Sequence, residues 1–279
     1  MELKTLKPQS MIFTIYGEYV RHFGGEIWVG SLTRLLGQFE MSEQAVRVAI
    51  SRIASQGWLK ARKVGNRSYY SLTPRGKKRM NEASARIYKQ TPGKWDGKWC
   101  IIHYNIPEKQ RAKRDQLRKE LSWMGFGMLA NSVWISPNDL ADRVKEIAES
   151  YNASEYIEVF RSEHHGASTD KQLVEKCWNL DEINRAYQEF INHYQPQYER
   201  LKEQVKKNEE ISDAECFVEK TKLVHEYRKF LFIDPSLPEE LLPDFWAGRE
   251  ADQLFRHYYE LLHPGAVRFF LSVFKSAPE

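Results

Sequence analysis

The stretch Met41–Gly57, MSEQAVRVAISRIASQG, contains a helix start, an amphipathic helix and a helix stop in succession. Ser42 is a suitable N-cap, because its hydroxyl can accept a hydrogen bond from a free backbone amide of the first turn. Gly57 can take up the left-handed conformation that often ends a helix. Between them, apolar residues recur at the spacing of one helix face and predict that this face is buried. They are Val46, Ala49, Ile50 and Ile53.

The opposite face of this predicted helix is mostly polar. It carries Gln44, Arg47, Val48, Ser51 and Ser55, with Arg52 on its flank. Glutamine can pair with an adenine edge and arginine with a guanine edge, so a helix of this composition suits the DNA major groove. A solvated surface helix explains the segment, taken alone, equally well. The candidate DNA-contacting residues of the helix are Ser42, Gln44, Arg47, Ser51 and Arg52.

The elements expected on either side of this helix follow the order of a winged helix-turn-helix. A helix at 8–22, a short strand at 26–29 and a second helix from Ser31 precede it, and strands at 58–63 and 68–72 follow it. Turn-forming residues between the last two strands favour a hairpin. A threonine and a proline then supply the cap and first position of a further helix. In this fold the third helix enters the major groove.

The hairpin, or wing, carries basic residues close to its turn. In a winged helix it lies along the DNA backbone or in the minor groove, so we expect Arg62, Lys63 and Arg67 to contact phosphates. Each neutralised phosphate releases counterions, and affinity should therefore fall steeply with salt. A solvated, lysine-rich hairpin is the alternative. Glu43 fits DNA poorly because a carboxylate repels phosphate, although it could accept a hydrogen bond from a cytosine amino group.

Charge is unevenly distributed along the chain, whose net charge is +4. Residues 1–90 hold 16 Lys and Arg against 6 Asp and Glu, a net charge of +10, whereas the remainder carries −6. A compact basic unit joined to an acidic remainder indicates that the first meets a polyanion and the second has another task. We therefore expect a winged-helix DNA-binding domain at 1–90.

The composition is that of an ordinary globular protein, with 42% hydrophobic and 29% charged residues. Three widely spaced cysteines, an odd number, argue against a disulfide framework and for a reducing cytosol. No apolar run approaches the roughly 20 residues of a membrane helix, and the first ten residues lack the apolar segment of a secretory signal. We therefore expect a cytoplasmic protein without a membrane segment.

Residues 95–165 have a β-α-β-α-β order, which predicts a ferredoxin-like α/β domain with helices on one face of its sheet. A buried strand at Trp99–Tyr104, then Ile106-Pro107, a basic helix and Gly125-Phe126 resemble the small CRISPR-associated ferredoxin-like nuclease subunit. The metal-binding aspartate of that family aligns with Asn105, and an amide is a poorer magnesium ligand than a carboxylate. We therefore expect a domain without nuclease activity and without a metal site. Its role would be structural, in dimerisation or in relaying a signal between the other domains.

Residues 169–279 show helical spacing throughout and predict an all-helical domain for effector binding and dimerisation, interrupted at Gln195-Pro196. Polar side chains occur there among aromatic residues. The candidate effector-binding residues are His225, Arg228, Trp246 and Arg249. An aromatic-lined cavity with a few cationic residues would suit an acyl thioester with a phosphorylated tail. The alternatives are structural: a hydrogen-bonded core histidine, an arginine paired with a nearby acid and a packed tryptophan.

Along nearly its whole length the chain resembles the PaaX family of repressors of phenylacetate catabolism. In the first segment the resemblance is carried by Pro8–Phe13 (PQSMIF), Ser42–Arg47 (SEQAVR), Ser51–Ile53 (SRI), Gly57–Leu59 (GWL) and Ser68–Thr73 (SYYSLT) with Gly76. Downstream it is carried by Ile106–Glu108 (IPE), Gly125–Gly127 (GFG), Trp134–Pro137 (WISP), Trp178–Leu180 (WNL), Leu223–Arg228 (LVHEYR), Asp234–Pro238 (DPSLP) and Leu242-Pro243. Each piece is short, but their number and common order make the signal specific.

The resemblance implies a cytoplasmic homodimer that represses phenylacetate degradation genes by binding a double-stranded DNA operator. It further implies that phenylacetyl-coenzyme A, an acyl-CoA effector, releases the protein from this operator, with no cofactor. A repressor of the same build that answers another acyl-coenzyme A is an open alternative, as are an acyl-coenzyme-A enzyme and a metal-dependent nuclease using the central domain. The chain has no glycine-rich phosphate cradle and no G-x-S-x-G nucleophile motif. We therefore expect a regulator that is not an enzyme and has no catalytic residue.

Overall fold

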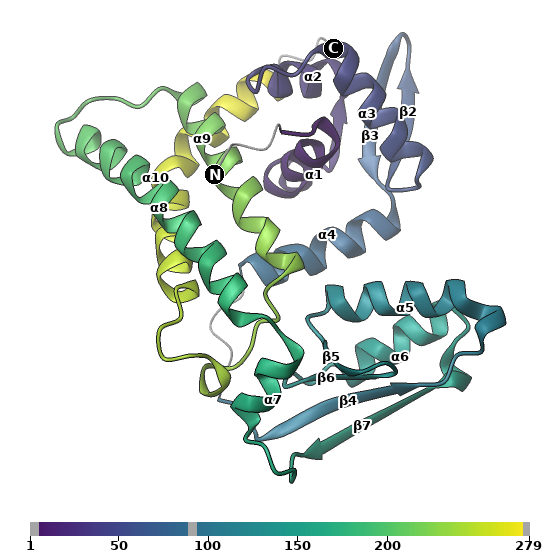
Figure 1. Cartoon of the computed structure of the whole chain (residues 1–279). Coiled ribbons are helices and arrows are strands. Elements are labelled where there is room, and N and C mark those ends of the chain that lie inside the picture. Colours follow the sequence, from purple (N-terminus) through teal and green to yellow (C-terminus); the bar gives the residue numbers. More distant parts are fainter. Residues whose placement is uncertain (1–5, 89–93, 276–279) are drawn as a thin grey trace. The chain divides into compact units, whose positions relative to one another are not determined.

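The computed structural model describes residues 6–88 and 94–275 (Figure 1). They form two compact units. Unit 1 takes in the described residues of Met1–Tyr88, Gln188–Arg228 and Arg249–Glu279, and unit 2 those of Lys89–Tyr187 and Lys229–Gly248. The helices expected at 169–279 are thus divided between both units, and the three domains expected from the sequence stay a prediction. The linker expected at Thr91–Lys94 lies, apart from Lys94, outside the described residues.

Unit 1 begins with the elements of a winged helix-turn-helix, as the sequence predicts. They are α1 (Pro8–Glu18), β1 (Glu26–Trp28), α2 (Val29–Gly37), α3 (Glu43–Ser55), β2 (Leu59–Val64), β3 (Arg67–Leu72) and α4 (Pro74–Ile87). The three strands form an antiparallel sheet in the order β1-β3-β2. The wing is the hairpin β2–β3, whose register pairs Leu59 with Leu72 and Val64 with Arg67.

Local chemistry sets the ends of these helices. The Ser42 hydroxyl accepts a hydrogen bond from the Ala45 amide at 3.2 Å and starts α3. Gly57 has a φ of 75° and directs the chain from α3 into the wing. Thr73 caps α4 in the same way as Ser42 caps α3, with Pro74 at the first helical position. The caps and the stop predicted from the sequence are therefore confirmed.

The predicted core face of α3 is buried. Val46 and Ile53 are 0% exposed, Ile50 is 2% exposed and Ala49 is 9% exposed. They pack beneath α1 and α2, the helices that contact α3. Because burying an aliphatic side chain contributes about 1.5–3 kcal/mol, this face holds α3 firmly and leaves the opposite face to solvent.

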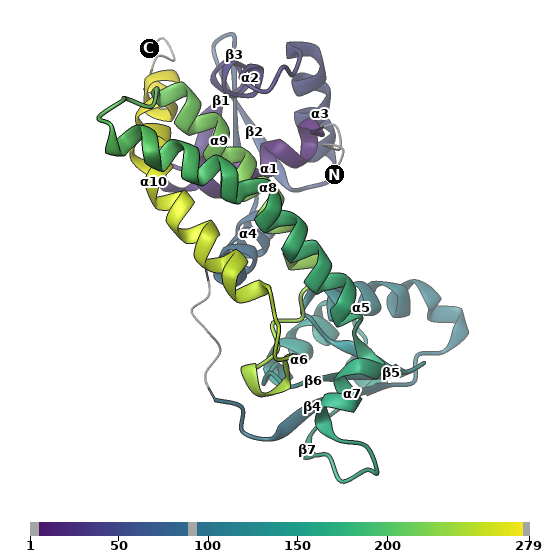
Figure 2. The ribbon, with the colours of Figure 1, turned by 60° about the vertical axis from the view of Figure 1, so that its left-hand side comes forward.

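Three long helices complete unit 1. They are the second part of α8 (Leu180–Lys206), α9 (Asp213–Tyr227) and α10 (Gly248–Lys275). Figures 1 and 2 both show α9 and α10 beside α1. Phe270 stacks on Tyr19, the residue that follows α1, and Phe217 packs on the same ring at a tilt. The interruption expected at Gln195-Pro196 is wrong: α8 continues through Pro196. A proline removes one backbone donor, and the long apolar face of α8 outweighs that loss.

Unit 2 contains the ferredoxin-like sheet. Its main elements are β4 (Lys98–Tyr104), α5 (Arg111–Trp123), β5 (Gly127–Ala130), β6 (Val133–Ser136), α6 (Ala141–Ser150) and β7 (Ile157–Glu163), followed by α7 (Asp170–Cys177). The strands are antiparallel in the order β5-β6-β4-β7, and α5 and α6 cover one face (Figure 1). Leu117, Leu121 and Val144 of these helices pack on Cys100 and Ile102 of β4.

Candidate nucleic-acid interface

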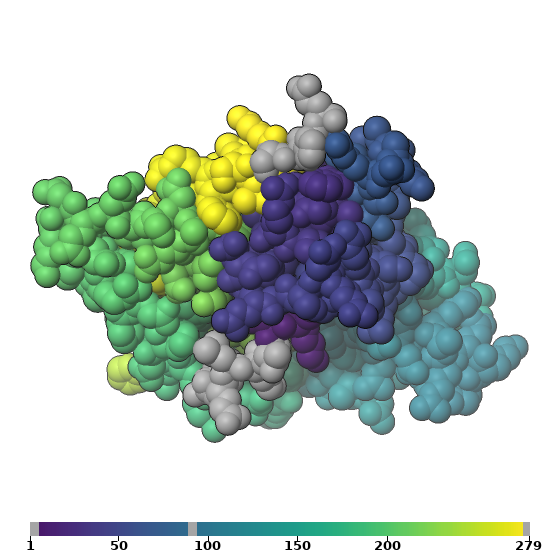
Figure 3. Space-filling model, turned by 90° about the horizontal axis from the view of Figure 1, so that it is seen from above, coloured from purple at the N-terminus to yellow at the C-terminus, as the bar shows by residue number. Residues whose placement is uncertain are grey.

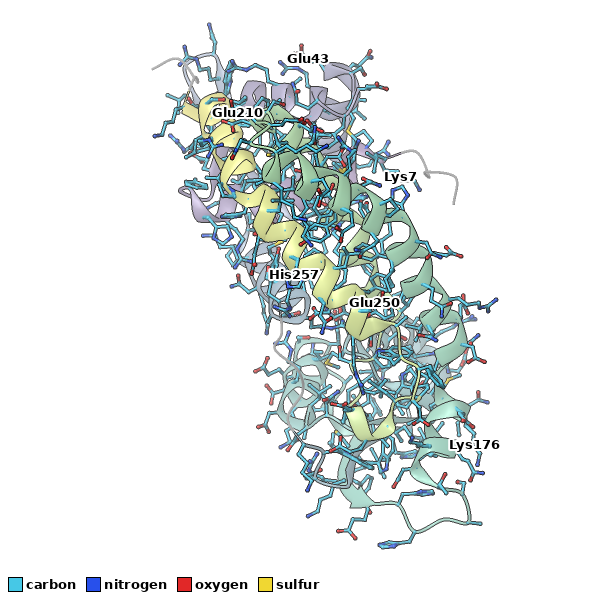
Figure 4. All side chains as sticks on the ribbon, turned by 90° about the vertical axis from the view of Figure 1, so that its left-hand side faces the viewer. Lys7, Glu43, Lys176, Glu210, Glu250 and His257 are labelled. Carbon is cyan, nitrogen blue, oxygen red and sulfur yellow. The ribbon has the colours of Figure 1, made fainter. Side chains whose placement is uncertain are left out.

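The outer face of α3 brings most of the predicted DNA-contacting residues together. One shallow hollow on the surface is lined by Glu43, Gln44, Arg47, Val48, Ser51, Arg52 and Ser55. Ser42, the N-cap, is exposed just before them. In Figure 3 the winged-helix segment, purple to blue, forms an open part of the surface. Figure 4 shows Glu43 at the periphery of unit 1, on the side away from His257 and Glu250 of α10. The face that the sequence assigns to DNA is therefore accessible.

Arg47 is held along the helix by Glu43. The Arg47 Nε donates to Glu43 Oε1 at 2.7 Å, and a second guanidinium nitrogen lies 2.5 Å from the same oxygen. The two side chains are 53% and 61% exposed. A pair this exposed contributes at most about 1 kcal/mol, so Arg47 can leave Glu43 for a base edge at small cost. Glu43 thus acts as an intramolecular partner for Arg47 when DNA is absent.

The three basic residues of the wing have different surroundings. The Arg62 Nε lies 3.1 Å from both carboxylate oxygens of Glu26 on β1, and its guanidinium lies 5.3 Å from the ring centre of Tyr69. The Arg67 guanidinium lies 5.9 Å from the ring centre of Trp28. Lys63, next to Arg62 in β2, is exposed. Because successive side chains of a strand point to opposite faces, Lys63 projects from the other side of β2 than Arg62.

The hydrogen bond and charge of Arg62 change the titration of Glu26. The bond donated by Arg62 lowers the pKa of Glu26 below its ordinary value, against a smaller opposing effect of burial. Arg62 therefore pairs with Glu26 in the protein without DNA, and its predicted contact with phosphate stays a prediction. Another basic residue at the base of the wing, Arg75, stacks 4.2 Å from the ring centre of Trp58. Sequence reasoning missed Arg75, although its position after Thr73-Pro74 places it in the first turn of α4.

Two of the effector candidates form hydrogen bonds with α1. His225 is 4% exposed, and its Nδ1 lies 3.0 Å from the Thr14 hydroxyl of α1. Arg228 donates to the Ser10 carbonyl at 3.0 Å and also to the Ser10 hydroxyl. Its Nε is buried and has no hydrogen-bond partner among the residues that the structure describes, and burial lowers the pKa of Arg228 to about 10. Both side chains therefore connect the end of α9 to α1.

The other two effector candidates have different neighbours. Trp246 belongs to unit 2 and packs edge-on against Tyr187, with ring centres 5.6 Å apart. Arg249 is exposed at the start of α10 in unit 1. The structure thus brings His225, in the last turn of α9, close to Arg228 at the C-cap of this helix, whereas Trp246 belongs to the other unit and Arg249 to another helix. Their role toward an effector stays a prediction.

The central segment carries Asn105 directly after β4. Its side chain is exposed, and its backbone N–H donates to the Tyr156 carbonyl at 2.9 Å. Within 6–88 and 94–275, no group of three or more His, Cys, Asp or Glu side chains could hold a metal ion. In the same described ranges, no helix has both the length and the apolar composition needed to cross a membrane.

These features define a winged-helix protein with a ferredoxin-like sheet and a helical C-terminal region. Three family models match it: PaaX-like protein over residues 7–76, PaaX protein central Cas2-like domain over 92–174 and PaaX-like protein C-terminal domain over 178–272. The chain is 35% identical over 263 residues to Transcriptional repressor PaaX of Escherichia coli (strain K12), covering 93% of this chain and 82% of that protein. The chain therefore belongs to the PaaX family, and the resemblance seen in the sequence is confirmed.

A solved structure supports the same architecture. The uncharacterized protein Rv0674 from Mycobacterium tuberculosis superposes with a TM-score of 0.55 and 19% sequence identity, covering 93% of this chain and 97% of that one. At this identity the likeness shows a shared fold. It extends over the winged helix, the ferredoxin-like sheet and the C-terminal helices together.

Proposed function

We propose that this protein is a DNA-binding transcriptional repressor of phenylacetate degradation genes and that phenylacetyl-coenzyme A releases it from its operator. The observation that carries the DNA-binding part is the open face of α3, where Gln44, Arg47, Ser51 and Arg52 line one hollow. These side chains can pair with base edges in the major groove. The phenylacetate part rests on the similarity to Transcriptional repressor PaaX of Escherichia coli.

The proposed repressor acts as a homodimer in the cytoplasm and catalyses no reaction. Two winged helices related by a two-fold axis would contact half-sites about one helical turn, or a multiple of it, apart. The wing would meet phosphates through Lys63 on one face of the hairpin, and through Arg62 and Arg67, which lie against Glu26 and Trp28, on the other. The three cysteines are unpaired, which fits a reducing compartment.

The contacts between α9 and α1 support a route by which an effector could weaken DNA binding. His225 and Arg228 hold Thr14 and Ser10 of α1, and α1 packs directly on α3. An effector that changed the position of α9 would therefore act on the helix that supports the recognition helix. To do so, phenylacetyl-coenzyme A must bind the DNA-bound and released states with different free energies. The coupling is reciprocal, so operator DNA should weaken effector binding by the same factor.

The test compares binding of the full-length protein to labelled promoter fragments of phenylacetate genes and to random duplexes of equal length at moderate ionic strength. We expect a preference for a promoter fragment and a loss of this preference when phenylacetyl-coenzyme A is added. An absence of preference for every promoter fragment would overturn the DNA-binding proposal. Thermal-shift measurements with a series of acyl-coenzyme A compounds identify the effector, because a ligand of the folded state raises the melting temperature. A shift with another member of the series, but not with phenylacetyl-coenzyme A, would overturn the effector assignment.

A further inference from the structure

Val48 is an exposed apolar side chain in the middle of a polar face. Of the large apolar side chains of α3, Val46, Ile50 and Ile53 are buried, whereas Val48 is 51% exposed. Valine also favours a helix less than alanine, because its branched side chain loses rotamer freedom there. Neither core packing nor helix propensity therefore explains a valine at this position.

The neighbours of Val48 on the helix are the polar candidates for base contact. Gln44 lies one turn before it, and Ser51 and Arg52 lie one turn after it, at the spacings that share a helix face. All four side chains line the same hollow. Val48 thus occupies the centre of the surface that a major groove would cover, and its methyl groups would meet base edges rather than phosphates.

The major groove offers one apolar group, the C5 methyl of thymine. Contact with this methyl removes apolar surface of both partners from water, which is favourable. A hydroxyl or amide at the same position would instead form a hydrogen bond with the edge of a base. Gln44, one turn away, can pair with an adenine, so the two side chains together suit a site that contains A·T pairs.

We propose that Val48 is a specificity-determining residue that packs on the C5 methyl group of a thymine in the major groove. This assignment rests on the proposed DNA-binding function and adds the chemistry of one base position in each half-site. Substitution of uracil for that thymine removes the methyl group and leaves every hydrogen-bonding group of the base in place. The exchange therefore isolates the contact that Val48 makes.

The experiment first selects the preferred duplex of the wild-type protein from a random pool and then replaces its thymines by uracil one at a time. We expect one position in a half-site at which uracil lowers the affinity of the wild-type protein about three- to fivefold, the value of one buried methyl group. In Val48→Ala, the same replacement should no longer change the affinity. The variant should fold normally, because the side chain is exposed and alanine favours the helix.

Val64→Ala is the matched control. Val64 is 46% exposed at the tip of the wing, where it would meet the backbone or the minor groove, and the minor groove displays no thymine methyl. Val64→Ala should therefore keep the full sensitivity to uracil. Equal sensitivity of the wild-type protein and Val48→Ala, or no sensitive position at all in a selected duplex, would overturn the Val48 assignment and leave DNA binding intact. Failure to select any duplex would overturn the proposed function together with it.

Discussion

The ammonium of Lys220 on α9 lies 3.0 Å from the Oε2 of Glu18 on α1, and the two side chains are 0% and 5% exposed. Lys220 also lies 4.5 Å from the ring centre of Tyr19 and 4.3 Å from that of Tyr259, while Tyr88 donates to the other Glu18 oxygen. Burial lowers the pKa of Lys220, and the charge of Glu18 opposes this effect. The winged helix and the C-terminal helices of unit 1 therefore share one buried ionic cluster.

Removal of one partner from this pair should destabilise unit 1 strongly. In Lys220→Met the apolar packing is largely kept, but the Glu18 carboxylate stays buried without its counter-charge. We expect the free energy of unfolding to fall by about 3–5 kcal/mol, measured by urea denaturation at pH 7. The double variant Lys220→Met/Glu18→Gln removes both charges and should recover most of that loss. A double variant as unstable as the single one would show that the ion pair is not the source of the effect.

Arg47→Ala should reduce specific DNA binding without unfolding α3. We expect a loss of roughly 1–3 kcal/mol in affinity for a preferred duplex, measured by fluorescence anisotropy, and a change below about 1 kcal/mol in the free energy of unfolding, because the Arg47–Glu43 pair is exposed. Glu43→Gln breaks the same pair but keeps Arg47, and it should preserve or strengthen binding by removing a negative charge near phosphate. Unchanged affinity in Arg47→Ala would contradict the assignment of α3 as the recognition helix.

Lys63→Ala should weaken binding to all duplexes alike. Lys63 is exposed on the wing, and a lost phosphate contact reduces the slope of log affinity against log salt concentration by about 1. Affinities measured between low and moderate salt, on preferred and random duplexes, give this slope. Arg62→Ala serves as the comparison and should change the slope less, since the Arg62 charge is already paired with Glu26. A loss confined to one sequence after Lys63→Ala would contradict a phosphate contact.

Features that depend on neighbours in sequence could be predicted from the sequence. The caps at Ser42 and Thr73 and the stop at Gly57 need only one turn of chain, and the buried face of α3 follows from its own spacing. The same spacing predicts the outer face of α3, which is the main part of the candidate site. The sequence does not predict β5. This strand has only four residues at a sheet edge, and its exposed Met128 and Leu129 give no alternation of buried and exposed positions.

Pairings between distant segments could not be predicted. Glu18 and Lys220 are 202 positions apart, and Glu26 and Arg62 are 36 apart. The residues next to Glu18 and Glu26 in the sequence do not indicate which lysine or arginine each carboxylate will contact. For this reason the sequence gives no sign that Arg62 pairs with Glu26, and its phosphate contact stays a prediction. The environment of Arg228 depends likewise on Ser10, at the other end of the chain.

The Glu26–Arg62 pair should make the free energy of unfolding depend on pH in the acid range. The hydrogen bond from Arg62 lowers the pKa of Glu26 in the folded state below the ordinary value of 4.5. At a pH between these two pKa values, the unfolded state therefore binds more protons than the folded state. The contribution of the pair is complete above pH 4.5 and is lost as the pH falls through the folded pKa. We expect Arg62→Ala to lower the free energy of unfolding at pH 6 and to differ less from the wild-type protein near pH 3. Urea denaturation at several pH values, with Lys63→Ala as the control that leaves the pair intact, tests this expectation. If the difference between Arg62→Ala and the wild-type protein stays constant across this range, Arg62 does not act through the ionisation of Glu26.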